Sequence, residues 1–196
     1  MYDSKMNLKS DDMTMTTISG REVLFSVFEL KDADQLTEYY EHLSELSRKR
    51  YGPHQFDKQS IIDLYGKRGG HQGYIAREPG SPTIIAYSII RFGCLEHDLG
   101  RLKSYGLNMD VETDSVYAPS VADAWQSCGV GNSMFLFILE DLKRIGITRV
   151  ILWGGVQADN EKAVGFYKKN GFQKLGEFEH NGNNIDMMLE IKQVTA

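Results

Sequence analysis

The sequence contains few cysteines, no long hydrophobic run and no excess of positive charge. Cys94 and Cys128 are too few for a disulfide framework and too far apart for the spacing of a zinc site. No stretch approaches the roughly 18 apolar residues that a transmembrane helix needs. The first 20 residues are polar and charged, so we expect no signal peptide. These absences favour a reducing cytoplasm and predict neither a metal site nor a membrane contact.

The charge balance also argues against general nucleic-acid binding. Twenty-two Lys and Arg residues stand against 27 Asp and Glu residues, which gives a net charge of −5 and a pI near 5.6. With 196 residues, 41% of them hydrophobic, the chain is long enough to bury roughly 70% of its unfolded surface around one core. We expect a loosely ordered lead-in over residues 1–20 and a single domain over 21–196.

Hydrophobic periodicity predicts an alternation of strands and helices. The expected strands cover residues 21–30, 72–77, 83–92, 115–121, 148–153, 172–178 and 185–191. The expected helices cover residues 32–51, 57–67, 130–144 and 159–170, with Asp32 as the cap of the first. The polar stretch 95–114 predicts an acidic excursion over the surface. Short strand–helix–strand units in the second half predict a mixed sheet covered by helices.

A glycine-containing loop, residues 125–131, follows a predicted strand and opens a hydrophobic helix. Backbone N–H groups at a helix start have no partner within the helix and attract an anion, so this loop fits a phosphate group. A simple connecting turn remains the alternative. The loop is not a dinucleotide fingerprint, because Met134 stands where a third glycine is needed, and it lacks the Gly-Lys-Ser/Thr ending of a Walker loop.

A second segment, residues 156–172, joins this loop in a pattern that resembles the GNAT superfamily of acyl-CoA-dependent N-acyltransferases. That family has a Val-x-Pro-x-Tyr-Gln/Arg-x-x-Gly-x-Gly/Ala segment followed by Asn-x-x-Ala-x-x-Phe-Tyr-x-Lys-x-Gly-Phe. The matching residues here are Val121, Trp125, Gln126, Gly129 and Gly131, then Asn160, Ala163, Phe166, Tyr167, Lys169, Gly171 and Phe172. The resemblance spans residues 115–191, whereas the first half matches only in the order of its elements.

The resemblance implies an α/β (α+β) fold with a mixed, mostly antiparallel, twisted sheet of about seven strands. Helices are expected on both faces, and the central strands splay apart near Pro119, which cannot donate to a sheet ladder. The resemblance also implies acetyl-CoA as cosubstrate, with the pantetheine arm along the backbone of the strand end and the pyrophosphate in the loop. The implied contacts are Val121, Ala122, Gln126, Ser127, Cys128, Gly129, Val130, Gly131, Asn132, Asn160, Ala163, Phe166, Tyr167 and Lys169.

Three of these residues also have structural alternatives. Asn160 can serve as an N-cap for the following helix, which is compatible with a cofactor contact. Cys128 fits an ordinary loop thiol. Tyr167 matches the family residue whose phenol protonates the departing thiolate, and it also fits a core aromatic position.

The general base is harder to find in the sequence. Several family members carry Glu or His near the middle of the strand at 115–121, where this chain has no acid and no imidazole. Asp114, Asp123, His97 and Glu96 are possible substitutes, each with the alternative of a solvated surface residue. Of these, Asp114 is our prediction for the base.

These inferences together predict an N-acetyltransferase that moves an acetyl group from acetyl-CoA to a primary amine by direct attack in a ternary complex. The acceptor is expected to be a small-molecule or peptide amine, and the acidic stretch 96–114 suggests a cationic one. A homodimer would be ordinary for the family. The alternatives are a non-catalytic acyl-CoA sensor or interaction module and, on the glycine loop alone, a nucleotide-binding module.

Overall fold

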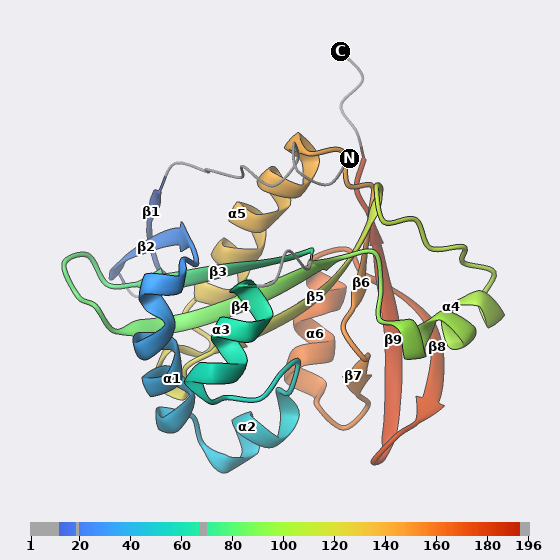
Figure 1. Cartoon of the computed structure of the whole chain (residues 1–196), viewed down its shortest axis with the longest axis horizontal. Coiled ribbons are helices and arrows are strands. Elements are labelled where there is room, and N and C mark those ends of the chain that lie inside the picture. Colours follow the sequence, from blue (N-terminus) through green and yellow to red (C-terminus); the bar gives the residue numbers. More distant parts are fainter. Residues whose placement is uncertain (1–11, 19, 67–69, 193–196) are drawn as a thin grey trace. The chain divides into compact units, whose positions relative to one another are not determined.

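The computed structural model describes residues 12–18, 20–66 and 70–192 (Figure 1). The chain divides into two compact units, and each unit combines two segments of the sequence. Unit 1 consists of Met1–Ile89 and Ala118–Asp141, and unit 2 consists of Ile90–Tyr117 and Leu142–Ala196. The strands β4 (Ile84–Phe92) and β5 (Asp114–Val121) each run from one unit into the other. The prediction of a single domain over residues 21–196 stays a prediction.

Unit 1 is built on antiparallel strands. β1 (Met13–Thr16) pairs with β2 (Glu22–Val27), and β2 pairs with β3 (His71–Arg77), with Phe25 opposite Ala76. β4 follows β3 in the strand order. The helices of this unit are α1 (Ala33–His42), α2 (Glu45–Arg50), α3 (Lys58–Gly66) and most of α5 (Val130–Arg144), joined by short 3-10 turns at Leu30–Asp32 and Asp123–Trp125.

The alternation of side chains along these strands places helices on both faces of the sheet. On one face, the rings of Phe25 and Tyr74 lie 6.1 and 6.0 Å from the ring of Phe137 on α5. On the other face, the ring of Phe28, just after β2, lies 4.6 Å from that of Tyr65 on α3. Figure 1 shows α1 and α3 on one side of β3 and β4 and α5 on the other side.

Unit 2 combines parallel and antiparallel pairing. The first half of β5 runs parallel to β6 (Arg149–Leu152), and β6 pairs antiparallel with β9 (Asn183–Glu190). β7 (Val156–Gln157) and β8 (Gln173–Glu179) both pair antiparallel with β9. The helices are α4 (Leu99–Ser104), preceded by a 3-10 turn at Glu96–Asp98, and α6 (Glu161–Lys169). Leu102, Val116 and Ile151 form the centre of a hydrophobic cluster in this unit.

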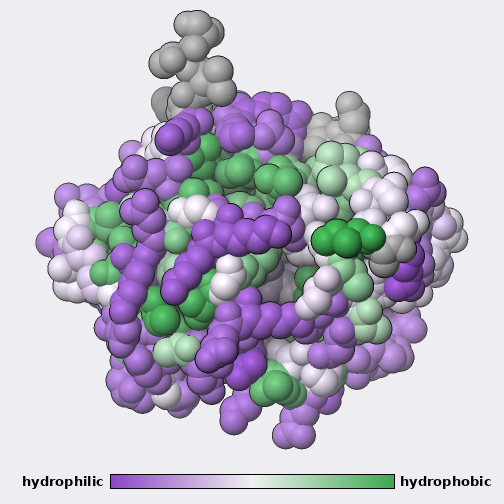
Figure 2. Space-filling model, turned by 180° about the vertical axis from the view of Figure 1, so that it is seen from behind, coloured by the Kyte–Doolittle hydropathy of each residue, from purple (hydrophilic) through white to green (hydrophobic). Residues whose placement is uncertain are grey.

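The predicted fold class is confirmed: the strands form a mixed, mostly antiparallel sheet with helices. The described residues contain nine strands rather than about seven. The register of β5 with β6 ends at the pair Tyr117–Leu152, two residues before Pro119. No helix in the described part of the chain is long and apolar enough to cross a membrane. The face drawn in Figure 2 is largely hydrophilic, with hydrophobic side chains in smaller groups.

Three sequence predictions need correction. The lead-in is partly ordered, because Met13–Thr16 forms β1 against β2, whereas residues 1–11 and 19 lie outside the described part. The helix predicted over 32–51 is interrupted at Leu43, whose backbone is extended, and Ser44 then caps α2 through a hydrogen bond from the Ser47 amide at 3.2 Å. The stretch 95–114 contains a helix, α4, and is not a purely polar surface segment.

The predicted cap at Asp32 also differs in detail. Its side chain makes no cap hydrogen bond to α1. One oxygen accepts from the Glu29 amide at 3.0 Å, and the other pairs with Arg77 on β3 at 2.9 Å. Asp32 therefore fixes the short turn before α1 to the sheet.

Candidate functional site

The loop expected to hold a phosphate lies in unit 1, between β5 and α5. Ser127 and Gly129 both have left-handed backbones, with φ of 62° and 92°. Alternation of left-handed residues with ordinary ones turns successive N–H groups toward one side and forms a concave site for anions. α5 begins directly afterwards at Val130, so the partial positive charge of its first turn lies at the same place. The local backbone of this loop suits a phosphate group.

Two contacts fix the loop to the rest of unit 1. The Gln126 side-chain amide donates to the Val121 carbonyl at 3.2 Å, which ties the loop to the end of β5. The Ile18 amide donates to the Cys128 carbonyl at 3.3 Å. A Cβ atom on Gly129 would lie 3.3 Å from the Ile18 side chain, so a glycine suits both the left-handed backbone and this close approach.

Ile18, which follows β1, therefore borders the loop, a contact that sequence spacing does not reveal. The guanidinium of Arg21, just before β2, lies 3.5 Å from the centre of the Trp125 ring. A contact between a cation and an aromatic ring far along the chain leaves no periodic pattern in the sequence. The predicted contact residues Gln126–Asn132 therefore form one continuous segment, with Arg21 and Ile18 as neighbours that were not predicted.

The backbone of Ala122 is already engaged within unit 1. Its amide donates to the Ile85 carbonyl at 2.9 Å, and its carbonyl accepts from the Trp125 amide at 2.8 Å. The Val121 carbonyl accepts from Gln126. Pairing of the Ala122 amide with a pantetheine arm would cost its bond to Ile85, whereas its carbonyl can accept a second hydrogen bond, so this geometry leaves only the carbonyl for the expected pairing.

The second predicted group of residues lies in unit 2, on and before α6. The Asn160 side chain accepts a hydrogen bond from the Ala163 amide at 3.3 Å, so Asn160 is the N-cap of α6. Ala163 and Phe166 are half-buried, and Lys169 is exposed in the last turn. The capping alternative for Asn160 is confirmed, and it leaves a cofactor contact open.

Tyr167 is buried on α6 between two aromatic rings. The ring centres of Phe166 and Phe172 lie 5.2 and 5.4 Å from its own. Burial raises the pKa of Tyr167 well above its ordinary value of 10.0. The phenol therefore keeps its proton at neutral pH, which excludes a role as the base, and the raised pKa makes it a weaker acid than a free phenol.

Asp114 has a structural environment that does not suit a base. It is fully buried. Its two oxygens accept hydrogen bonds from the Arg149 guanidinium, both at 2.6 Å, and one of them also accepts from the Asp110 amide at 2.7 Å. A fully buried carboxylate whose two oxygens are both engaged by a guanidinium is not free to contact a substrate amine. This arrangement corrects the expectation that Asp114 is the base.

A second carboxylate of the acidic stretch, that of Asp98, also forms an ion pair inside unit 2. Asp98 is 2% exposed and pairs with Arg101 at 2.8 Å, and Arg101 also bonds to the buried Asp186 at 2.7 Å. The guanidinium of Arg101 lies 3.7 Å above the Phe178 ring. Asp98 and Asp114 therefore hold unit 2 together, and they weaken the surface-charge argument for a cationic acceptor. Within the described residues, no group of His, Cys, Asp and Glu side chains is placed to hold a metal ion.

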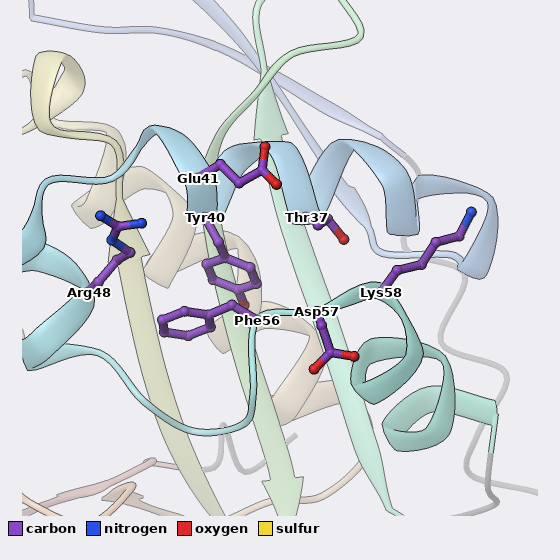
Figure 3. A pocket seen from close by; sticks show the side chains of 7 residues that line it. All are labelled: Thr37, Tyr40, Glu41, Arg48, Phe56, Asp57 and Lys58. Atoms are coloured by element: carbon purple, nitrogen blue, oxygen red, sulfur yellow. The ribbon is translucent and has the colours of Figure 1, made fainter.

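A cavity of about 310 Å³ lies elsewhere in unit 1, between α1, α2 and the start of α3 (Figure 3). It is lined by Thr37, Tyr40, Glu41, Arg48, Phe56, Asp57 and Lys58. The rings of Tyr40 and Phe56 stack with their centres 4.4 Å apart and form its aromatic wall. None of these seven residues was predicted as a site residue.

Comparison with known proteins gives a family and a fold. Residues 36–172 match the model of the acetyltransferase (GNAT) family. A comparison with curated protein sequences gives no match.

Solved structures with a similar fold include several acetyltransferases. The GNAT domain of S. lividans PAT has a TM-score of 0.72 at 18% identity, with 92% of this chain and 97% of that chain covered. YncA, a putative acetyltransferase from Salmonella typhimurium with its cofactor acetyl-CoA, has a TM-score of 0.65 at 15% identity over 89% and 96%. The ribosomal-protein-S18-alanine N-acetyltransferase from Escherichia coli has a TM-score of 0.60 at 15% identity over 88% and 96%.

Proposed function

The chain belongs to the acetyltransferase (GNAT) family, and from this premise we propose that it transfers an acetyl group from acetyl-CoA to a primary amine. The amine attacks the thioester directly in a ternary complex, without a covalent enzyme intermediate. The observation that carries the proposal is the loop Gln126–Asn132, whose left-handed residues and helix start suit the pyrophosphate of acetyl-CoA. The proposed contacts of this loop are Gln126, Ser127, Cys128, Gly129, Val130, Gly131 and Asn132.

The backbone near Val121 is the proposed neighbour of the pantetheine arm, as an added strand pairs with a sheet edge. In unit 2, the proposed cofactor contacts are Asn160, Ala163, Phe166, Tyr167 and Lys169. They rest on the correspondence of each residue to the family pattern.

Tyr167 is the proposed general acid. As the amine nitrogen bonds to the thioester carbon, the carbon–sulfur bond breaks and the sulfur leaves as a thiolate, while the nitrogen releases one proton to water. The Tyr167 phenol donates its proton to that sulfur. Burial raises the pKa of Tyr167, so the phenol is protonated when the thiolate forms. Because a thiol has an ordinary pKa of about 8.5, this proton transfer is uphill and depends on stabilisation of the phenolate by the site.

Calorimetric titration with acetyl-CoA tests the proposal, with NAD and ATP as controls. Saturable binding that is selective for acetyl-CoA supports the phosphate loop and justifies assays of thiol release with a panel of primary amines. If a folded sample binds NAD or ATP but not acetyl-CoA, the proposed function is wrong and a nucleotide-binding module takes its place.

Replacement of Tyr167 by Phe separates an enzyme from an acyl-CoA sensor. We expect kcat to fall about 100-fold or more, because general acid catalysis contributes on that order, while acetyl-CoA affinity changes little. Tyr105→Phe, also in unit 2, is the matched control and should keep the wild-type kcat. A wild-type protein that binds acetyl-CoA but releases no thiol with any amine would be a sensor.

A further inference from the structure

The loop that we propose for the pyrophosphate has no positive side chain of its own. Its residues, Gln126–Asn132, include no Lys, Arg or His, and the same is true of the whole stretch from Ser104 to Leu142. Lys143 and Arg144 lie in the last turn of α5, at the opposite end of that helix from the loop. Because the phosphates of acetyl-CoA carry several negative charges, this site needs a cation from a distant part of the chain.

The residues that connect β1 to β2 bring such a cation to the loop. The guanidinium of Arg21 lies 3.5 Å from the centre of the ring of Trp125, which directly precedes Gln126. From the same connection, the Ile18 amide donates to the Cys128 carbonyl at 3.3 Å. Arg21 and Ile18 therefore reach the loop at two separate points, its start and its middle.

Backbone hydrogen bonds fix the position of Arg21. Its amide donates to the Thr17 hydroxyl at 3.0 Å, and its carbonyl accepts from the Thr17 amide at 2.8 Å. Between them, the Gly20 amide donates to the Thr17 carbonyl at 2.9 Å, with a left-handed backbone at Gly20 (φ 79°). The Trp125 ring is buried. The backbone of Arg21 and the ring beneath its guanidinium are thus both held in place, which lowers the entropy lost when the guanidinium binds an anion.

The guanidinium of Arg21 has N–H donors for a ligand. A guanidinium carries five N–H donors in one plane, and its fork matches two oxygens of a phosphate. Stacking on Trp125 engages the flat face and not these donors. The ion pair of Arg21 with Glu78 has an N–O distance of 3.7 Å, longer than a hydrogen bond, and both side chains are 46% exposed. An exposed pair of this kind is weak, so a phosphate can compete with Glu78.

We propose that Arg21 binds a phosphate group of acetyl-CoA and supplies the positive charge that the loop Gln126–Asn132 lacks. This inference rests on the proposed function, which places the pyrophosphate in that loop. The backbone N–H groups of the loop hold the pyrophosphate, and the fork of Arg21 donates to phosphate oxygens beside it. The ligand offers two such groups, the pyrophosphate itself and the 3′-phosphate of the ribose.

Calorimetric titration of Arg21→Gln with acetyl-CoA tests the proposal. The Kd should rise about tenfold or more, because hydrogen bonds to charged groups contribute on that order. Arg21→Lys keeps the charge without the fork and should show a smaller rise. The wild-type Kd should also increase with KCl concentration more steeply than the Kd of Arg21→Gln, since the variant has lost a charged contact.

Titration with 3′-dephospho-acetyl-CoA identifies the phosphate. If Arg21 binds the 3′-phosphate, the wild-type protein and Arg21→Gln should have the same Kd for this analogue. If Arg21 binds the pyrophosphate, Arg21→Gln should lose affinity for both ligands alike, with the weaker salt dependence. An equal loss for both ligands with the wild-type salt dependence would mean that Arg21 only supports the loop, and this result would overturn the proposal.

Glu78→Gln is the matched control, because it removes the same ion pair and keeps Arg21. Its Kd for acetyl-CoA should stay the same or fall. Equal weakening by Glu78→Gln and Arg21→Gln would mean that the ion pair itself maintains the site, contrary to the proposal. Arg48→Gln, at an exposed arginine on α2, controls for the change in net charge and should keep the wild-type Kd.

A second variant covers the case in which Arg21→Gln does not fold. Arg21→Met keeps an unbranched apolar side chain over Trp125 and removes the charge, so it should show the same loss of affinity. A wild-type Kd in either folded variant would overturn the role of Arg21 and leave the transferase assignment intact. Failure of the folded wild-type protein to bind acetyl-CoA would overturn the proposed function, and this inference with it.

Discussion

At the scale of single residues, Asp114 and His54 have opposite environments. Asp114 is buried with a guanidinium across both oxygens, so both oxygens are engaged in an ion pair. His54 is surrounded by phenols, which can donate to it but carry no charge at neutral pH. The two titratable side chains therefore differ in the charge of their partners: Asp114 has a guanidinium, and His54 has neutral phenols.

The ion pair of Asp114 gives the first prediction. Arg149→Met should lower the free energy of unfolding by about 3 kcal/mol, because it leaves a fully buried carboxylate without its partner. Urea denaturation measures this change. Lys174→Met is the control, since Lys174 and Glu177 form an exposed pair, and it should cost much less. Equal effects in the two variants would mean that the buried pair contributes no more than a surface pair.

The sequence predicted the candidate site where the residues lie close together in the chain. The loop 125–131, the helix after it and the Asn160 cap depend on neighbours within a few positions, and each was predicted. The partner of Asp114 is 35 positions away, and the hydroxyls hydrogen-bonded to His54 come from α1 and β4. Such contacts are made by the fold, so sequence spacing did not reveal that Asp114 is held in an ion pair.

At the scale of elements, predictions were correct where the pattern of an element is local in the sequence, and elements were missed where contacts with distant residues order them. The helices α5 and α6 have regular hydrophobic spacing and were predicted to within two residues at each end. α4 was missed because it has only six residues and a single buried one, Leu102. It is held by contacts outside the helix, from Arg101 to Asp186 on β9 and from Tyr105 to Gly176 on β8. β1 was missed for a similar reason, since its four residues are ordered by pairing with β2.

The turn between β6 and β7 gives a prediction at this scale. Gly154 and Gly155 both have left-handed backbones, with φ of 65° and 74°. A Cβ atom at Gly155 would lie 2.8 Å from the Phe178 ring and 3.1 Å from the Ile185 carbonyl, whereas Gly154 has nothing within 4 Å. Gly154→Ala should cost about 1 kcal/mol of stability for the backbone alone. Gly155→Ala should cost roughly 1–3 kcal/mol more because of overpacking.

Chemical denaturation of the two glycine variants separates these contributions, since the backbone cost is shared and only the steric cost differs. Equal losses of stability would mean that Phe178 and the β9 backbone move aside without cost. A larger loss for Gly154→Ala would contradict the steric explanation.

At the scale of the whole molecule, buried phenols make the free energy of unfolding depend on pH. The pKa is raised, mainly by burial, for seven tyrosines among the described residues: Tyr39, Tyr40, Tyr51, Tyr65, Tyr87, Tyr105 and Tyr167. They occur in both units. In an unfolded chain, the same phenols ionise near the ordinary value of 10.0.

The coupling between phenol ionisation and the stability of the fold gives the last prediction. A group whose pKa is raised in the folded state contributes stability that is complete below its unfolded pKa and is lost as pH rises above it. The free energy of unfolding should therefore be insensitive to these phenols up to about pH 10 and fall steeply beyond it.

Alkaline titration, followed by phenolate absorbance and by circular dichroism on the same sample, measures this loss. Most of the phenolate signal should appear together with unfolding, whereas the chain in denaturant should titrate near pH 10. Ionisation of most tyrosines near pH 10 with the circular dichroism of the fold unchanged would mean that these phenols are open to water.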